Sequence, residues 1–290
     1  MNQKLFKMIA DKMPEFSKSQ KIIGSFMVEN YEKAAFMTAS KLGNTVGVSE
    51  STVVRFATEL GFDGYPQLQK ALQDLIKHRL TSIQRIQVTS EQIGSQDDVL
   101  SKVLNSDAEK IKKTLEVINT VTFHNAVESI VSAKTIYIIG IRTSGTLASF
   151  LSLYLNHIFN SVKLISSSSR SEMFEQMHRI NEEDVFIAIS FPRYSKKTVI
   201  AADFAKASGA CVIAITDTDT SPLANLADNL LLAKSDMTSF VDSLVAPLSL
   251  INALIVAVGL KKCDEISDTY EKLENIWEKY SVYEKTEEYI

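Results

Sequence analysis

The sequence has only two cysteines, Cys211 and Cys263, among its 290 residues. They lie far apart and match no ligand spacing of a metal site, so we expect no metal centre and a reducing compartment. The N-terminal segment also lacks the uninterrupted apolar run of a secretory signal peptide, because charged residues interrupt it throughout. These absences predict a cytoplasmic protein.

Long segments without Asp, Glu, Lys, Arg or His are scarce as well, and the run from Ser243 to Leu260 is the longest. It reaches the length of a membrane helix, but it contains Pro247, Ser249 and Asn252 and has charged residues at both ends. The run therefore predicts a buried helix or an oligomer interface rather than a membrane span.

The overall composition, 45% hydrophobic and 23% charged, is that of an ordinary globular protein, and the length favours two domains. The net charge of -4 is unevenly distributed: residues 1–80 hold 11 Lys and Arg against 8 Asp and Glu, whereas the remainder holds 20 against 27. The positive balance of the N-terminal part is small, and a solvated surface also shows such an excess by chance. Its sign agrees with a partner that carries phosphates.

Residues 38–62 have the spacing of a helix, a tight turn and a second helix. Thr38 and Ser49 are suitable N-caps, and Gly61 lies where a left-handed C-terminal cap is needed, so the second helix is expected from Glu50 to Leu60. A small residue, Gly43, is expected where the helices cross, and Gly47 at the turn. The apolar positions that this arrangement turns inward are Leu42, Val46, Val48, Val53 and Phe56.

In a helix-turn-helix motif the first turns of the second helix enter the major groove of DNA. The spacing alone also fits two ordinary helices around a glycine. If it is the DNA-binding motif, the candidate contacts are Ser49, Glu50, Ser51, Thr52 and Arg55.

Further helices complete an all-helical domain over residues 1–80. Ser17 and Gln20 form a capping box before one helix, and residues 65–80 read as another. Residues 81–124 are expected to be a linker and a connecting helix, whose apolar stripe suits packing on a neighbouring domain or subunit. The stripe consists of Leu100, Leu104, Ala108, Ile111, Leu115 and Ile118.

From Thr135 onward, apolar runs alternate with segments long enough for helices. The runs are TIYIIGI, VKLISS, DVFIAIS, ACVIAITD and NLLLAK. Continuous Val- and Ile-rich strands separated in this way predict a five-stranded parallel sheet covered on both faces, hence a three-layer α/β domain over residues 125–265 with a helical tail at 266–290.

Ligands of such sheets bind beyond the carboxyl ends of the strands. The loops expected there, residues 140–145, 166–171, 190–198 and 216–221, are rich in Ser and Thr, which can hold a phosphate or sugar at helix N-termini. Each hydroxyl can equally be a simple helix cap. The spacing of Gly140, Arg142 and Gly145 is neither a dinucleotide fingerprint nor a phosphate-binding P-loop, so we expect no nucleotide cofactor.

Two resemblances add to this interpretation. Residues 49–65, SESTVVRFATELGFDGY, closely resemble the N-terminal domain of RpiR/MurR-type transcription factors, in the pattern Ser-x-x-Thr-Val-x-Arg-Phe followed by Leu-Gly-Phe and Gly-Tyr. Residues 125–265 resemble a sugar isomerase (SIS) domain, which is the effector module of these regulators. The SIS resemblance implies a phosphosugar site that includes Gly140, Arg142, Ser144, Ser190, Arg193 and Ser195.

The second SIS motif matches only in part, because Pro192 and Arg193 replace its central Ser-Gly. Pro has no N–H to offer a phosphate, and Arg193 can compensate with a charged contact. The sequence thus predicts a homo-oligomeric DNA-binding regulator of sugar metabolism controlled by a phosphosugar. The alternative is a SIS-type sugar-phosphate enzyme, whose acid–base candidates are His157, Glu172, Glu175, His178 and Glu182.

Overall fold

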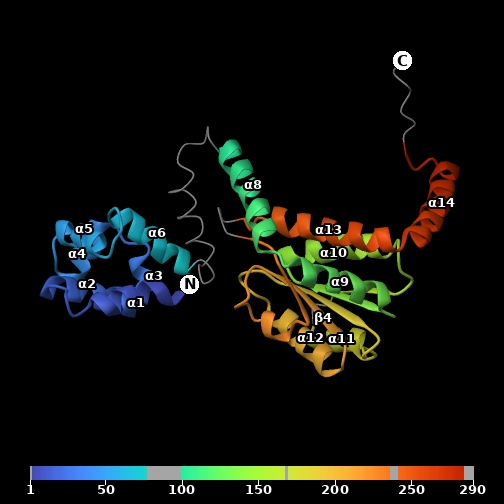
Figure 1. Ribbon diagram of the computed structural model, residues 1–290, viewed down its shortest axis with the longest axis horizontal. Helices are drawn as coiled ribbons and strands as arrows, with labels where there is room; N and C mark the ends of the chain where they lie inside the picture. The colour runs from blue at the N-terminus through green and yellow to red at the C-terminus, as the bar shows by residue number, and fades with distance from the viewer. Residues whose placement is uncertain (1, 77–98, 167–168, 236–240, 284–290) are drawn as a thin grey trace, which may run out of the picture. The chain divides into compact units, whose positions relative to one another are not determined.

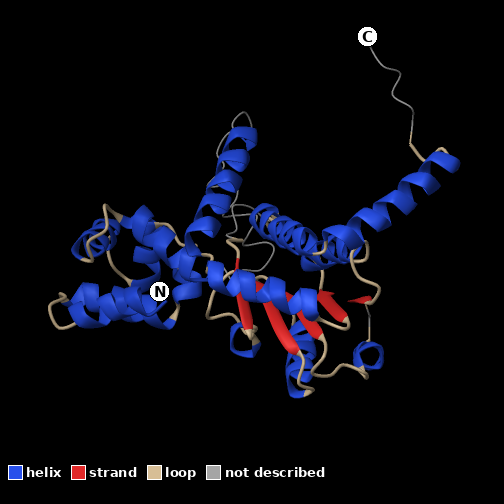
Figure 2. Cartoon of the chain, turned by 45° about the vertical axis from the view of Figure 1, so that its right-hand side comes forward, coloured by secondary structure: helices blue, strands red, loops and turns tan. Residues whose placement is uncertain are grey.

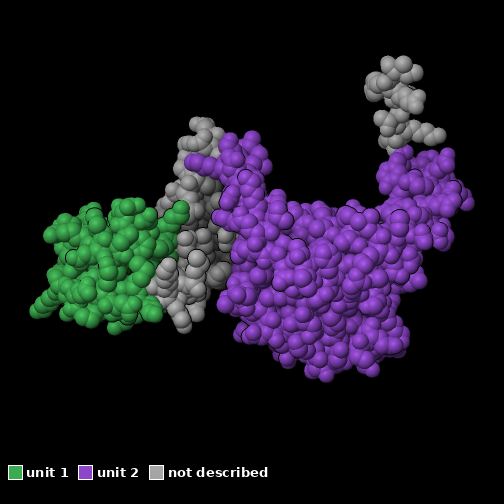
Figure 3. Space-filling view, viewed as in Figure 1, with its two compact units in different colours: residues 1–84 green, residues 85–290 purple. Residues whose placement is uncertain are grey.

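A computed structural model describes residues 2–76, 99–166, 169–235 and 241–283. The chain divides into two compact units, Met1–Gln84 and Arg85–Ile290 (Figure 3). The predicted linker at 81–98, together with Ser167 and Ser168 of the second hydroxyl-rich loop, lies outside the described residues.

Unit 1 is helical throughout its described part (Figure 1). Two predicted caps are confirmed, because Ser17 and Gln20 form a capping box and the Thr38 hydroxyl accepts a hydrogen bond from Lys41 N. The helices are α1 (Asn2–Lys12), α2 (Lys18–Glu29), α3 (Tyr31–Ala34), α4 (Ala39–Val46), α5 (Glu50–Glu59) and α6 (Tyr65–Ile76).

The helix-turn-helix prediction corresponds to α4 and α5. Gly47 ends α4 with φ of 76°, and Gly61 follows α5 with φ of 92°. Gly61 N donates to Thr58 O and Phe62 N to Ala57 O, which is the Schellman arrangement that favours glycine there. Of the five apolar residues expected to face inward, Leu42, Val53 and Phe56 are fully buried, whereas Val46 and Val48 are half-buried.

Gly43 is required by a closer approach than its spacing revealed. A Cβ at this position would lie 2.7 Å from the backbone carbonyl oxygen of Val48, a distance that real Cβ atoms do not adopt. The sequence predicted a small residue at this crossing. The structure shows that even alanine is too large at the crossing of α4 and α5.

Tyr65 connects α6 to the rest of unit 1 through hydrogen bonds. Its hydroxyl donates to Met37 O at 2.8 Å and lies 3.3 Å from Ala34 O, and burial raises the pKa of this hydroxyl. Gln73 on the same helix donates to Ala35 O. The aromatic residue of the Gly-Tyr motif therefore holds α6 against α3 and the segment before α4.

Unit 2 contains a five-stranded sheet in the order β2-β1-β3-β4-β5, and each neighbouring pair of strands is parallel (Figure 2). All five predicted strands are confirmed. They are β1 (Ile136–Gly140), β2 (Val162–Ile165), β3 (Val185–Ile189), β4 (Cys211–Thr216) and β5 (Asn229–Leu232).

Two helical layers cover the sheet. Alternate residues of β1 point to opposite faces: Ile136 and Ile138 join the core with α9 (Thr120–Ser132), α10 (Thr143–Leu155) and α13 (Val245–Lys261). Tyr137 and Ile139 join the core with α11 (Arg170–Met177) and α12 (Lys196–Ala207). This is the predicted three-layer α/β class; its expected domain limits, 125 and 266, fall inside α9 and α14 (Cys263–Lys279).

The charge-free run forms α13. Pro247 lies in the first turn, where its missing N–H costs no helical hydrogen bond. One face of α13, including Leu250, Ile251 and Leu254, is buried in the core. Across the described ranges, no single helix is long and apolar enough to cross a membrane, and α13 meets that test only together with α14, from which it is bent by 99°.

Helix α8 (Val99–Val117) has its apolar stripe on the outside. Leu104 and Leu115 are 60% and 76% exposed, whereas Lys110 and Thr114 on the opposite side are buried. Figure 1 shows that the C-terminal half of α8 lies beside the start of α13, while its other half extends away from the sheet. The apolar stripe predicted for this segment is therefore left uncovered by unit 2 itself.

Candidate functional site

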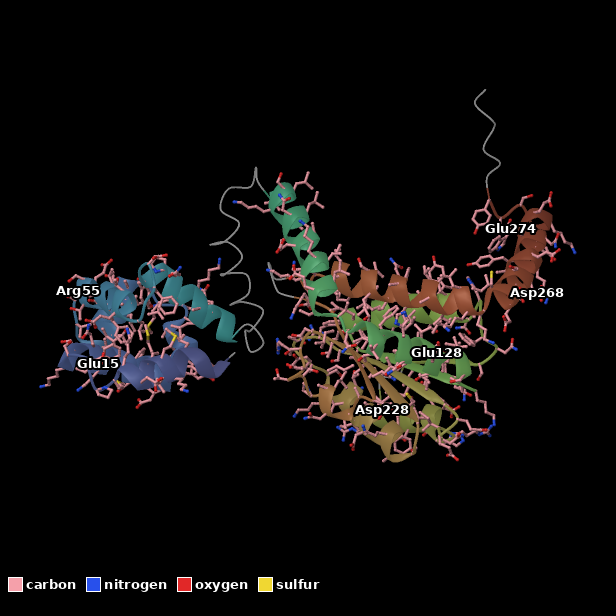
Figure 4. The ribbon with its side chains drawn as sticks, in the orientation of Figure 1. Glu15, Arg55, Glu128, Asp228, Asp268 and Glu274 are labelled. Carbon is pink, nitrogen blue, oxygen red and sulfur yellow. The ribbon has the colours of Figure 1, made fainter. Side chains whose placement is uncertain are left out.

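The first turn of α5 presents the predicted DNA-contact residues to solvent. Ser49, Glu50, Ser51 and Arg55 are exposed, and Thr52 is half-buried. Figure 4 marks Arg55 at the surface of unit 1, where its Nε lies 3.4 Å from Ser51 O one turn earlier.

The hydroxyls of this turn form a small network around Ser49. Its Oγ accepts from Thr52 N at 3.3 Å and lies 2.9 Å from Ser51 Oγ and 2.8 Å from Thr52 Oγ1. The N-cap prediction for Ser49 is thereby confirmed. The network aligns three hydroxyls at the helix N-terminus, where a hydrogen-bonding and positively polarised surface suits base edges or phosphate oxygens.

The strand order reverses at the carboxyl ends of β1 and β3, and we refer to this switch point, where open α/β sheets bind ligands, as the crevice. The chain runs from β1 outward to β2 and then returns to β3 on the other side of β1, so the two following loops diverge at this point. Gly140 ends β1 and pairs in register with Ile189, the last residue of β3. The loops that contain the predicted ligand residues therefore start side by side.

The start of α10 has no side-chain cap on its first backbone amides. Its N-cap residue is Arg142, whose φ of 60° is rare for a residue with a side chain. Arg142 is exposed, while Ser144 is buried within the first turn. A Cβ on Gly140 would overlap the backbone of Ser144, so Gly140 allows α10 to begin directly above β1. Its contribution to the site is this close packing.

Hydrogen bonds within the loop from β3 to α12 stabilise it. Ser190 is buried, and its Oγ accepts a hydrogen bond from Ser195 N at 3.2 Å. Ser195 in turn is the N-cap of α12 and accepts from Thr198 N at 3.4 Å. The capping alternative thus holds for Ser195, although its hydroxyl proton is still available to a ligand. Arg193 is exposed and forms no ion pair with the described residues.

Two contacts of this edge were missed by the sequence interpretation. Tyr194 Oη donates to Asp217 Oδ1 at 2.7 Å, which joins the loops after β3 and β4, and burial together with Asp217 raises the pKa of Tyr194. Thr143 Oγ1 lies 3.4 Å from Asp242 Oδ2, so an acidic residue from the segment before α13 lies at the start of α10. The position of Asp217 directly after a buried strand was the available signal for the first contact.

The acid–base candidates of the enzyme alternative do not gather at this edge. His157 follows the end of α10, and His178 the end of α11, so both lie toward the opposite edge of the sheet. His157 Nδ1 is 3.2 Å from Tyr270 Oη on α14. Glu182 precedes β3, and Glu175 Oε1 accepts a hydrogen bond from Ser171.

Glu172, which was the remaining candidate, lies in the first turn of α11 and is exposed. It comes from the loop after β2, at the same edge as the crevice. One exposed carboxylate is a weak basis for proton transfer at a sugar carbonyl, because such chemistry needs a positioned acid–base group.

Comparisons with known proteins agree with the two units. Residues 3–79 match the model of the rpiR-family helix-turn-helix domain, and residues 129–257 match the SIS domain. An uncharacterised HTH-type transcriptional regulator of Caldanaerobacter subterraneus is 26% identical over 89% of this chain and 91% of its own length. Another, of Clostridium perfringens, is 27% identical over 78% and 81%.

Solved structures show the same fold. The sugar isomerase domain of an RpiR transcription factor from Sphaerobacter thermophilus covers 61% of this chain and 99% of its own, with 24% identity and a TM-score of 0.59. The Vibrio vulnificus NanR protein, solved in complex with ManNAc-6P, covers 94% and 98%, with 23% identity and a TM-score of 0.56.

A helix-turn-helix unit with an exposed recognition helix, followed by a SIS-type α/β unit, defines a class of two-domain transcriptional regulator. Within that class, the chain belongs to the RpiR/MurR-type regulators.

Proposed function

We propose that α5 reads operator DNA and that a phosphorylated sugar, bound where β1 and β3 end, controls this binding. The observation that carries the proposal is the start of α10, whose first amides receive no side-chain cap and lie beside the exposed Arg142 at the crevice of the sheet. Arg193 on the neighbouring loop supplies a second cation. NanR, whose structure was solved with ManNAc-6P, supports the phosphosugar class of ligand.

The protein acts as a sensor rather than an enzyme in this proposal, because four of the five acid–base candidates lie away from the crevice or are engaged elsewhere. It requires no cofactor and works in the cytoplasm, where operator DNA and phosphosugars are both present. The genes it controls are those of sugar metabolism.

The oligomer interface in this proposal is the outward apolar surface of α8 and α13. The N-terminal part of α13 and the C-terminal part of α8 border an apolar groove that includes Leu115 and Phe123. The exposed apolar residues that extend this surface are Leu100, Leu104, Ile111, Val245, Val256 and Leu260. Pairing two chains brings two recognition helices to two half-sites, which one short helix needs for useful affinity.

The test is an operator titration. Duplexes selected from random DNA by the full chain serve as operator, and their affinity is measured with and without each member of a panel of phosphosugars that includes ManNAc-6P. We expect one phosphosugar to change operator affinity and to raise the melting temperature without being converted. Turnover of any phosphosugar would support the enzyme alternative instead.

A further inference from the structure

The buried side of helix α8, which faces the α/β unit, is polar and forms hydrogen bonds with it. Its buried side includes Lys110 and Thr114, which are 4% and 8% exposed, while its leucines face outward. Polar contacts gain little net free energy over contacts with water, so an attachment of this kind can exchange between two states more easily than a packed apolar one. Helix α8 is also the first described element after residues 77–98, through which the chain continues from the DNA-binding unit.

The described hydrogen bonds from α8 to the α/β unit go to one connection, between β5 and α13. At its start, Lys234 N donates to Thr114 Oγ1 at 2.9 Å. At its end, Ser243 Oγ donates to Asp107 Oδ1 at 2.7 Å, and Lys110 Nζ donates to the same oxygen at 3.1 Å. Asp107 therefore depends on Ser243 for one of its two hydrogen bonds with the described residues.

The residue beside Ser243 lies at the candidate ligand site. Asp242 Oδ2 accepts from Thr143 Oγ1, and Thr143 is the first residue of α10. Two consecutive residues of one short segment thus contact two different places: the helix start where an anion is expected, and the inner side of α8. A displacement of one is transmitted to the other through a single peptide unit, because neighbouring Cα atoms stay 3.8 Å apart.

We propose that residues 241–244 transmit the occupancy of the phosphosugar site to α8. The inference rests on the proposed function, since it takes the phosphate to lie at the start of α10. A phosphate dianion there meets the carboxylate of Asp242, and the two repel each other because they compete for the same positive end of the helix. Asp242 withdraws, Ser243 leaves Asp107, and α8 loosens from the α/β unit. The regulated element is α8, and with it the chain that leads to the DNA-binding unit.

The test uses hydrogen–deuterium exchange on the full chain, at one protein concentration, with ManNAc-6P and inorganic phosphate as the probes. In the wild-type protein, a probe that binds is expected to speed exchange in residues 99–117. Ser243→Ala should speed it about fivefold without any probe, as the loss of one hydrogen bond would. Ser267→Ala is the matched control, because this exposed hydroxyl on α14 bonds the Cys263 carbonyl one turn earlier.

Asp242→Asn separates repulsion from mere contact, since the amide oxygen can still accept from Thr143. We expect this variant to bind the probe about tenfold more tightly, because one negative charge beside the phosphate is gone, and to show a smaller change in α8 exchange. Binding that leaves α8 exchange unchanged in the wild-type protein would overturn the transmission alone. A probe affinity of Asp242→Asn equal to that of the wild-type protein would also overturn the transmission.

A wrong ligand site would give a different experimental result from a wrong transmission. If neither probe nor any other phosphosugar binds the wild-type chain, as judged by melting temperature and calorimetry, the ligand site itself is wrong and the transmission falls with it. If Ser243→Ala exchanges in α8 at the wild-type rate while a probe still binds, the site stands and the attachment of α8 is overturned.

Discussion

Arg55 is one turn into α5, exposed, and aligned with the hydroxyls of the first turn. An arginine in this place can make a bidentate contact to a base or a charged contact to phosphate. We predict that Arg55→Ala or Ser51→Ala weakens operator binding by about 1 to 3 kcal/mol, the usual cost of one lost groove contact. Phosphosugar binding should be unchanged. The measurement is a DNA titration, with Thr58→Ala in the last turn of the same helix as the control.

Unchanged operator affinity in both Arg55→Ala and Ser51→Ala would refute the placement of the recognition helix. A loss in Thr58→Ala as large as that in Arg55→Ala would point to general damage to α5, because within the described ranges the Thr58 hydroxyl donates only to Val54 O of its own helix.

Pro192 and Arg193 replace the central Ser-Gly of the SIS motif, and Pro192 has no backbone N–H, so Arg193 is the residue of this pair expected to compensate with a charged contact. A charge-assisted hydrogen bond is about twice as strong as a neutral one, so Arg193→Ala should lose more of the phosphosugar response than Ser144→Ala or Ser195→Ala. All three should keep near-normal operator affinity without ligand. The response is the ratio of operator affinities with and without the effector. Arg179→Ala, also exposed but just before the amino end of β3, is the control.

A normal response in Arg193→Ala would exclude the loop after β3 as the phosphate site. Ser195→Ala needs a second measurement, because its hydroxyl caps α12 and its loss costs about 1 kcal/mol of stability in itself. Its melting temperature separates this loss from the loss of a ligand contact.

Local signals predicted many of these residues, and tertiary contacts account for the rest. Ser49 and Ser195 precede helices in the sequence, so their capping positions follow from residue type and spacing. The contacts of Tyr194 with Asp217 and of Thr143 with Asp242 join segments 23 and 99 residues apart, and no local pattern encodes such a pair. The ligand assignments of Gly140, Arg142, Ser144, Ser190, Arg193 and Ser195 stay predictions.

At the scale of the element, the crossing of α4 and α5 depends on Gly43. Alanine improves helix propensity by up to about 1 kcal/mol, yet its Cβ would lie 2.7 Å from Val48 O. We predict that Gly43→Ala destabilises unit 1 by about 1 to 3 kcal/mol through overpacking and weakens operator binding, because α5 must shift. Thermal unfolding and a DNA titration measure the two effects.

Gly24→Ala is the matched control for Gly43→Ala. It is also a buried glycine inside a helix, α2, but its Cβ would meet the flexible end of Met13, which can move. This variant should be neutral or slightly stabilising. Equal behaviour of the two variants would show that the approach of α4 to α5 is less tight than the structure indicates.

The elements with continuous patterns were the predictable ones. Five Val- and Ile-rich runs predicted the five strands, and capping residues predicted where α2, α4 and α5 begin. Helix α8 was predicted only in part. Its apolar stripe predicted a contact surface, but the sequence pattern did not reveal that the polar side packs on the α/β unit and that the leucines face outward. The amphipathic pattern of a helix identifies its apolar side, but which surface that side contacts is determined by the tertiary fold.

At the scale of the whole molecule, we predict that the outward surface of α8 and α13 holds two chains together. Leu104→Lys and Leu115→Lys each place a charge in the proposed interface, and burying an unpaired charge is costly. Light scattering at micromolar concentration should show the wild-type chain as a dimer or larger and both variants shifted toward the monomer. Operator affinity should fall with them.

Val28→Lys is the control, since Val28 is an exposed apolar residue of unit 1. Isolated residues 95–290 should remain at least dimeric if the interface belongs to the α/β unit. A monomeric wild-type chain under these conditions would rule the interface out.

The strand order has a consequence for the folding of the chain during its synthesis on the ribosome. Strand β1 ends at residue 140 and lies between β2 and β3, so it is not flanked on both sides until β3, residues 185–189, has been synthesised. Unit 1, in contrast, is complete within its first 84 residues and consists of helices, which make mostly local contacts and form quickly. During each round of translation we therefore expect the DNA-binding unit to fold while the strands of the α/β unit are not yet all paired. For that interval, a nascent chain has its recognition helix but lacks the means to sense a ligand.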